Sequence, residues 1–304
     1  IKYILKGGST PIEKVVTGST TTDDNWNYTF TDLPKYNSQG NEIAYTIDEQ
    51  EVNQNDLKFY KKSINKYSIT NTFTVPDEKV SIAVTKHWED NSNANGKRPT
   101  SIKYVLKGGA APVEKVVSGN TTTDENWGYT FTNLPKYNES GDQIRYTIEE
   151  QEVNANDLKF YTKAVNGFNV TNTFKVPEDK LTIAVTKEWK DNSNVASKRP
   201  TSIKYVLKGG ATPIEEVVSG NNTTDADWNH TFTNVAKYND SGDEITYTLE
   251  EQEVSANDFK FYKKAISGDY KAGFKVVNTF EVPDEKVEVQ VNKVWEDDSN
   301  ANTK

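Results

Sequence analysis

The nine residues VSIAVTKHW, from Val80 to Trp88, have the alternation of a half-buried β-strand. Because side chains alternate between the two faces of a strand, one face holds Val80, Ile82, Val84, Lys86 and Trp88. Lys86 therefore lies on the face that the apolar residues assign to the core. Burying a charged lysine costs several kcal/mol unless the lysine is paired, whereas burying a neighbouring valine returns only about 2 kcal/mol.

The lysine-bearing strand occurs three times. LTIAVTKEW begins at Leu181 and VEVQVNKVW begins at Val287. The inward lysines are Lys86, Lys187 and Lys293, which are 101 (187 − 86) and 106 (293 − 187) residues apart. A second motif, IKYVLKGG or IKYILKGG, also appears three times, starting at Ile1, Ile102 and Ile203. A period near 100 residues is the size of a small domain, so the sequence predicts tandem domains.

Each repeat is predicted to be all-β, because short runs of Val, Ile, Thr, Tyr and Phe alternate with Gly, Asn, Asp and Ser. In the second repeat the expected strands are Val80–Trp88, Ile102–Lys107, Val113–Ser118, Tyr129–Thr132, Ile144–Glu150, Phe160–Val165 and Asn169–Val176. About seven short strands in 100 residues favour a small β-sandwich.

Three similar connectors mark the predicted boundaries. They are TVPDEKV (74–80), KVPEDKL (175–181) and EVPDEKV (281–287), each a proline followed by three charged residues. Such a short, charged joint is stiffer than a flexible tether. We expect a first domain over 1–75 that lacks its lysine strand, complete domains over 79–176 and 180–282, and the first strand of a further domain over 286–304.

Composition excludes several classes of function. The 304 residues have a net charge of −9, which disfavours nucleic acid and anionic membranes as partners. Without cysteine and with two histidines, neither a metal centre nor a catalytic triad is expected, and no cofactor is predicted. The loop Asp90–Gly96 is loosely similar to a calcium loop but has Ser101 where the twelfth ligand would be. No apolar run is long enough to enter a membrane as a span.

Two further polar residues per repeat are also expected to face the core. The last core-facing position of the fifth strand is a glutamate, at Glu49, Glu150 and Glu251. An asparagine stands among the inward apolar residues of the last strand, at Asn71, Asn172 and Asn278. We expect these strands and the lysine strand to lie together in the sandwich.

Lysine, asparagine and glutamate together suggest amide exchange, in which a lysine amine attacks an asparagine side chain, ammonia leaves and an isopeptide bond remains. Burial lowers the pKa of an amine and raises that of a carboxyl, which favours a neutral nucleophile and a proton-bearing acid. Two alternatives stay open at this point. The lysine and glutamate could form a buried ion pair, or a β-bulge could turn these residues outward.

The order of three motifs resembles a known family. The run VTKHWEDNSNANGKRPTSIKYVLKGG is followed by YTFTNLPKYNESGDQIRYTIEEQEV and NVTNTF. This pattern is similar to the collagen-adhesin (Cna) B-type repeats of Gram-positive surface proteins and extends over essentially the whole chain. The resemblance implies a transthyretin-like or inverse immunoglobulin-like sandwich with an internal Lys–Asn isopeptide bond. By position it pairs Lys86 with Asn172 assisted by Glu150, and Lys187 with Asn278 assisted by Glu251.

The resemblance also implies a function. We expect a structural stalk outside a Gram-positive cell, part of a wall-anchored parent whose other modules bind a host matrix ligand. The bond would form once per domain, so the chain is not an enzyme in the sense of turnover. Two rival functions are repeats that bind a host ligand such as collagen directly, and a carbohydrate-binding module using exposed rings at Trp26, Trp127 and Trp228.

The two ends of the sequence complement each other. The first repeat has Glu49 and Asn71 without a lysine strand, and Val287–Trp295 offers Lys293 without a domain. One interpretation is a segment cut out of register from a longer array. The other hypothesis is head-to-tail pairing, in which the lysine strand of one molecule completes the first repeat of the next, beside contacts between neighbouring repeats of the same protein.

Overall fold

The computed structural model describes residues 1–296 and is almost entirely β-structure. It divides into two compact units, Ile1–Phe174 and Lys175–Lys304. The second and third repeats each contain two packed sheets and seven strands, so the predicted fold class is confirmed. No described helix has the length and apolar character needed to cross a membrane.

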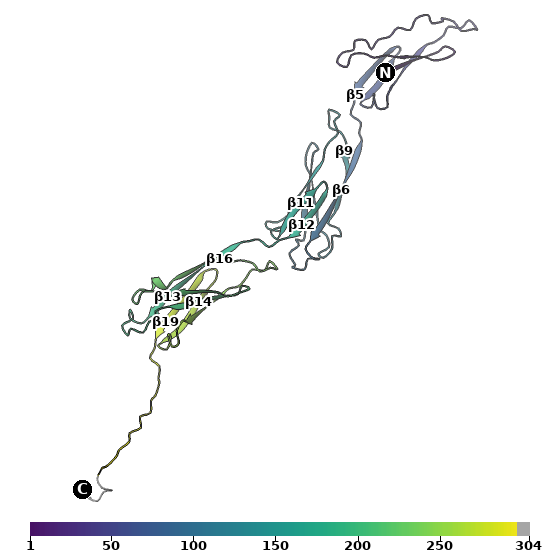
Figure 1. The fold of residues 1–304 in the computed structure, drawn as a ribbon. Coiled ribbons are helices and arrows are strands. Elements are labelled where there is room, and N and C mark those ends of the chain that lie inside the picture. Colours follow the sequence, from purple (N-terminus) through teal and green to yellow (C-terminus); the bar gives the residue numbers. More distant parts are fainter. Residues whose placement is uncertain (297–304) are drawn as a thin grey trace. The chain divides into compact units, whose positions relative to one another are not determined.

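The second repeat begins with the strand that contains Lys86. Its strands are β6 (Lys79–Glu89), β7 (Ile102–Lys107), β8 (Val113–Val117), β9 (Tyr129–Pro135), β10 (Thr147–Glu152), β11 (Tyr161–Asn166) and β12 (Asn169–Phe174). One sheet has the order β11-β12-β6-β9, whose members are labelled in Figure 1, and the other has the order β10-β7-β8. The first and last strands of the repeat are therefore parallel neighbours in one sheet.

The fifth strand begins later than expected. The sequence predicts a strand from Ile144, but β10 starts at Thr147. Residues 144–146 instead follow a short bridge between Tyr137 and Gln143, and the Ile144 amide donates to the Lys136 carbonyl at 2.9 Å. The side-chain alternation continues through this turn, which is why the sequence alone extends the strand.

The third repeat has the same plan. Its strands are β13 (Lys180–Lys190), β14 (Ile203–Lys208), β15 (Ile214–Val218), β16 (His230–Ala236), β17 (Thr248–Glu253), β18 (Tyr262–Asp269) and β19 (Gly273–Phe280). The sheets have the orders β16-β13-β19-β18 and β15-β14-β17, and the short 3-10 turn η1 (Ala226–Trp228) precedes β16. The five extra residues of this repeat lengthen the hairpin between β18 and β19.

The first repeat is less complete in the described chain. It has β1 (Lys2–Lys6), β2 (Ile12–Val15) and β3 (Thr46–Gln50) in one sheet, and the hairpin β4 (Tyr60–Asn65) with β5 (Ser68–Phe73). Residues 28–34, which correspond to β9, form no strand here. In the second repeat β9 pairs with β6 alone, and among the described residues of the first repeat no strand takes the place of β6 beside residues 28–34.

The core of each complete repeat is built around one tryptophan. Trp127 is fully buried, and its ring packs edge-on against Trp88 with ring centres 5.2 Å apart. Tyr104 is also fully buried and donates from its hydroxyl to the Trp127 carbonyl at 2.8 Å. Gly119 approaches the indole so closely that a Cβ at this position would lie 2.4 Å from it. Thin cores of this kind depend on a few large rings.

The connector between the first two repeats makes specific contacts within its unit. The Glu78 carboxylate accepts from Lys58 at 2.8 Å and from Lys136 at 2.9 Å, one residue from each repeat. Lys58 also donates to the Tyr137 hydroxyl at 2.7 Å, and the Phe59 ring packs edge-on against Tyr137. These contacts join residues on both sides of the connector, and the stiffness expected from its charged sequence stays a prediction.

The predicted division into 1–75, 79–176, 180–282 and 286–304 stays a prediction. Among the described residues no strand pairs across the connectors between β5 and β6 or between β12 and β13. Residues 281–296 differ from expectation, because they form an extended trace without a strand (Figure 1). Val287, Val289 and Val291 are at least 80% exposed, since no sheet pairs with them. Residues 297–304 of the last predicted domain lie outside the described chain.

Candidate functional site

Lys86 and Asn172 lie on the two neighbouring parallel strands β6 and β12. The register places Val170 opposite Lys86 and Asn172 opposite Trp88. The alternating burial of β6, with Val84, Lys86 and Trp88 all buried, puts the lysine on the core face as the sequence predicts. Asn172 is fully buried on β12 next to the inward Val170.

Glu150 reaches the same region from the facing sheet. It lies on β10 opposite Tyr104 of β7, and its side chain is fully buried. The Lys86 Nζ is 3.7 Å from the Glu150 Oε1, and the lysine side chain is also fully buried. The three strands therefore lie together, but only those of Lys86 and Asn172 are neighbours in a sheet, while the glutamate comes from across the core.

The third repeat repeats the arrangement. Val276 lies opposite Lys187, and Asn278 lies opposite Trp189. The Lys187 Nζ is 3.3 Å from the Glu251 Oε1, and both side chains are fully buried. The second and third repeats thus show the same placement of lysine, glutamate and asparagine.

The lysine amine is enclosed by the protein and lies against an aromatic ring. The Lys86 Nζ lies 3.9 Å from the centre of the Trp88 ring, and the Lys187 Nζ lies 3.9 Å from that of Trp189. Burial lowers the pKa of Lys86 from its ordinary 10.5 to about 8, although the Glu150 carboxylate opposes this shift. Burial likewise lowers the pKa of Lys187 to about 8 and raises that of Glu251. Both shifts favour the uncharged forms of the pair.

The hydrogen-bonding capacity of these groups is largely unused. Within residues 1–296, several buried polar atoms of the two sites have no hydrogen-bond partner: both carboxylate oxygens of Glu150 and Glu251, both amide heteroatoms of Asn172 and Asn278, and the Lys187 amine. An unsatisfied buried polar group costs about 1–3 kcal/mol, so such a cluster requires an explanation other than stability.

The first repeat brings its two residues together without a lysine. Glu49 is buried, and the Asn71 Nδ2 donates to its Oε2 at 2.8 Å. Lys293 lies in the extended segment near the C-terminal end of the described chain, where it is exposed and its amine stacks over Trp295 at 4.3 Å. Lys293 belongs to the second compact unit, whereas Glu49 and Asn71 belong to the first.

A buried ion pair closes the end of the sandwich next to the lysine. Arg98 donates from Nε and Nη2 to the two carboxylate oxygens of Asp90, both at 2.6 Å, and the Tyr161 hydroxyl donates to Asp90 at 3.0 Å. The Arg98 guanidinium also stacks over Trp88. Asp90 is the first residue of the loop that is loosely similar to a calcium loop, and both of its carboxylate oxygens accept hydrogen bonds from Arg98. The equivalent group in the third repeat is Asp191, Arg199 and Tyr262.

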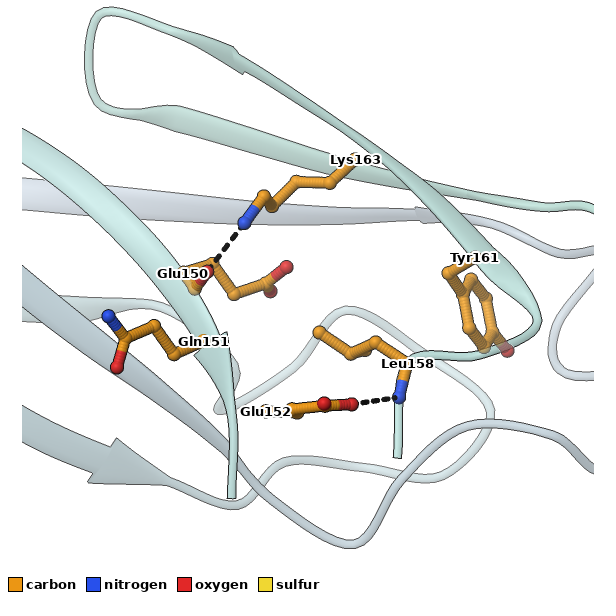
Figure 2. A pocket seen from close by; sticks show the side chains of 6 residues that line it. All are labelled: Glu150, Gln151, Glu152, Leu158, Tyr161 and Lys163. Atoms are coloured by element: carbon orange, nitrogen blue, oxygen red, sulfur yellow. Dashed lines mark hydrogen bonds between the residues drawn. The ribbon is translucent and has the colours of Figure 1, made fainter. Parts of the chain in front are cut away.

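A second lysine near the glutamate was missed in the sequence analysis. Lys163 follows Tyr161 on the same phase of β11 and donates to the Glu150 main-chain carbonyl at 2.5 Å. It lines a surface pocket of about 490 Å³ together with Glu150, Gln151, Glu152, Leu158 and Tyr161 (Figure 2). The alternation of Tyr161, Lys163 and Val165 was the signal that could have found it.

The tryptophans do not suit a carbohydrate-binding surface. Trp127 and Trp228 are fully buried, and Trp26 is partly buried. Stacking on a sugar requires an exposed ring face, so this rival function loses the residues on which it depended.

Comparison with known proteins agrees with the architecture. A sequence profile of the Cna protein B-type domain matches residues 4–72, 82–173 and 183–279. The collagen adhesin of Staphylococcus aureus is 35% identical over 295 residues, which cover 96% of this chain and 22% of that protein. The crystal structure of two B repeat units (B1B2) of the S. aureus collagen binding protein is 28% identical and covers 92% of this chain and 69% of that chain, with a TM-score of 0.33. The crystal structure of a single B repeat unit (B1) of the same S. aureus protein is 31% identical. It covers 67% of this chain and 100% of that chain, with a TM-score of 0.28.

Tandem all-β repeats, each with two packed sheets, define a repeat region of the kind found in surface adhesins. Within that class the chain belongs to the Cna protein B-type domain family, which confirms the resemblance read from the sequence motifs. The chain spans 22% of the length of its S. aureus relative.

Proposed function

We propose that the chain is the stalk region of a bacterial surface protein and that each complete repeat is stiffened by an autocatalytic Lys–Asn isopeptide bond. The bonds join Lys86 to Asn172 and Lys187 to Asn278, with Glu150 and Glu251 as the assisting acids. The observation that supports this most directly is the burial of all three groups in the core, with the carboxylate oxygens of Glu150 and Glu251 and the side-chain amides of Asn172 and Asn278 left without hydrogen-bond partners.

The chemistry is a single amide exchange. The neutral Lys86 amine attacks the Asn172 Cγ, the new N–Cγ bond forms, and the Cγ–Nδ2 bond breaks. Glu150 in its protonated form donates a hydrogen bond to the amide oxygen and relays the amine proton to the leaving nitrogen, which departs as ammonia. The product is a neutral secondary amide, so the buried site no longer contains an amine that must be kept uncharged.

Burial of the amine and its closeness to the asparagine accelerate formation of the isopeptide bond. The amine pKa of about 8 gives a useful fraction of nucleophile near neutral pH, and the rigid sheet holds the reactants at a high effective molarity. The pocket beside Glu150 offers ammonia a short route to solvent. Because the product stays in the protein, each repeat reacts once and is not an enzyme.

The position of the bond explains its value in a stalk. It closes a loop of 86 residues (172 − 86), which by analogy with a disulfide stabilises the fold by about 4–5 kcal/mol. A pull on the ends of the repeat would pass from β6 through the bond into β12. The residues between Lys86 and Asn172 would then bear almost no load.

The proposal extends to the location and partners of the chain, and its membership of the family supports this part. We place the chain outside a Gram-positive cell as part of a wall-anchored protein whose other modules contact the host. The relative is named for collagen, and direct collagen binding by these repeats is the alternative function. A solid-phase assay of the purified chain on collagen distinguishes the two, because a stalk shows no saturable binding.

Intact mass under denaturing conditions tests the bond. The wild-type chain should be lighter than its sequence by the mass of two ammonia molecules. The variant Lys86→Ala should lack one of these losses, and Lys86→Ala with Lys187→Ala should lack both. Tryptic peptides that join the segments around Lys86 and Asn172 would locate the bond. A wild-type mass equal to that of the sequence would reject the proposal and leave buried ion pairs.

Head-to-tail pairing between molecules is a further part of the proposal. The extended segment near the C-terminal end exposes Val287, Val289 and Val291. In the first repeat, Glu49 is buried and accepts a hydrogen bond from the Asn71 side chain. If Lys293 of one chain bonded to Asn71 of another, denaturing gels would show a ladder that Lys293→Ala abolishes. A clean monomer band would exclude the covalent form of this pairing.

A further inference from the structure

Each repeat has a second inward lysine directly opposite the reactive asparagine. The antiparallel registers place Lys62 opposite Asn71, Lys163 opposite Asn172 and Lys264 opposite Asn278. Residues directly opposite each other in an antiparallel pair project from the same face of the sheet. The lysine therefore stands on the inner face, but on an edge strand where the sandwich is open to solvent.

The amine of this lysine binds the main chain of the assisting glutamate. Lys163 donates to the carbonyl of Glu150 at 2.5 Å, and Lys62 donates to that of Glu49 at 2.6 Å. Lys264 makes the same contact with Glu251. Figure 2 shows Lys163 reaching from its own strand to the main chain at Glu150. This hydrogen bond from lysine to the glutamate carbonyl recurs in all three repeats. It is present even in the first repeat, which has no equivalent of Lys86 in the described chain.

This contact connects the two sheets at the site. Glu150 belongs to the sheet β10-β7-β8, whereas Lys163 and Asn172 belong to the sheet β11-β12-β6-β9. Fixing the Glu150 main chain to Lys163 also fixes it relative to Asn172, the cross-strand neighbour of that lysine. A carboxyl group must approach its target within hydrogen-bonding distance, and small displacements of a catalytic group can reduce a rate about 100-fold.

We infer that Lys62, Lys163 and Lys264 are positioning residues for the cross-linking reaction, each holding the glutamate main chain at the distance from the asparagine that lets its carboxyl assist. The inference rests on the proposed isopeptide function. The positioning lysine does not react itself, because its ammonium lies at the exposed edge as a hydrogen-bond donor, whereas Lys86 is fully enclosed.

The two complete repeats of one chain allow an internal control. We would synthesise the full chain in a cell-free system, stop samples in acidic denaturant over time, and quantify the cross-linked peptide of each repeat. In Lys163→Met, formation of the Lys86–Asn172 bond should slow about tenfold or more, while the Lys187–Asn278 bond forms at the wild-type rate. Lys163→Arg, which keeps a long cationic donor, should restore most of the rate. Lys103→Met removes a partly buried lysine of the same repeat that pairs with Glu114 and not with the glutamate of the site, and it should change neither isopeptide bond.

A separate measurement distinguishes positioning from loss of the fold. Urea unfolding of Lys163→Met in the Asn172→Ala background, where no bond can form in the second repeat, should retain a cooperative transition for that repeat. A slow reaction in a repeat that is unfolded would overturn the positioning role. So would a wild-type rate in Lys163→Met. A wild-type chain that never loses ammonia would instead reject the proposed function, which separates the two failures.

Discussion

Asn172 lies opposite Trp88 on the neighbouring parallel strand, so Lys86, two residues before Trp88, is its diagonal neighbour on the same inner face. Asn278 has the same relationship to Lys187 through Trp189. A diagonal offset leaves room for the long lysine side chain to extend along the sheet towards the amide. The Trp88 ring, whose centre lies 3.9 Å from the Lys86 Nζ, covers one side of the amine.

Glu150→Gln should block bond formation in the second repeat. The amide is nearly isosteric with the carboxyl but cannot relay a proton, and loss of general acid–base assistance costs about 100-fold or more. Intact mass should show one ammonia loss instead of two. Glu149→Gln is the matched control, because Glu149 is half-exposed and pairs with Lys107. Two losses in the Glu150→Gln chain would remove the glutamate from the mechanism.

The pH dependence of stability should reveal the buried amine when the bond is prevented. In Asn172→Ala the free Lys86 has a folded pKa of about 8, below its ordinary 10.5. Between pH 8 and pH 10.5 the unfolded state binds more protons than the folded state, so the free energy of unfolding rises with pH. Below pH 8 the free-energy cost of burying the protonated Lys86 amine is present in full.

Urea unfolding from pH 7 to pH 10.5 measures this effect against Lys86→Met in the same Asn172→Ala background. The methionine variant should be the more stable of the two at pH 7, and the difference should shrink above pH 8. A difference that is constant with pH would mean that Lys86 keeps an ordinary pKa in the folded protein.

Asp90→Ala should strongly destabilise the second repeat. Arg98 would remain buried without its carboxylate partner, which costs about 3–5 kcal/mol. Tyr161→Phe removes one hydrogen bond to Asp90 and should cost only about 1 kcal/mol. Glu114→Ala removes an exposed ion pair with Lys103 and should change stability by less than about 0.5 kcal/mol. Differential scanning calorimetry of the three variants checks the order, and equal effects for Asp90 and Glu114 would contradict it.

Gly119→Ala should disturb the packing of the tryptophan core. The added Cβ would lie 2.4 Å from the Trp127 ring, and such overpacking costs about 1–3 kcal/mol. Gly109→Ala is the control, since its Cβ would meet Tyr146 at an ordinary 3.6 Å. Near-UV circular dichroism and thermal unfolding should change for Gly119→Ala alone. If both variants melt with the wild type, the close approach of Gly119 to the indole is not structurally important.

Local sequence patterns are enough to predict the repeat, the all-β class and the inward-facing positions of the lysine, glutamate and asparagine. These are local properties, because alternation along a strand fixes which face a side chain joins once one face is buried. The sequence pattern wrongly started the strand of Glu150 at Ile144, whereas β10 starts at Thr147. The alternation of side chains gives no information about where the backbone pairing begins.

The pairing of the strands and the side chains that lie between the sheets are known only from the folded structure. Lys86 and Asn172 became neighbours through parallel pairing of strands that are distant in sequence, and Glu150 faces them from the other sheet. The link from Lys163 to the Glu150 carbonyl likewise depends on how the two sheets are stacked. Strand pairing and sheet packing are non-local, so no periodicity in a single sequence specifies them; they are fixed when the core excludes water and the backbone groups find their partners.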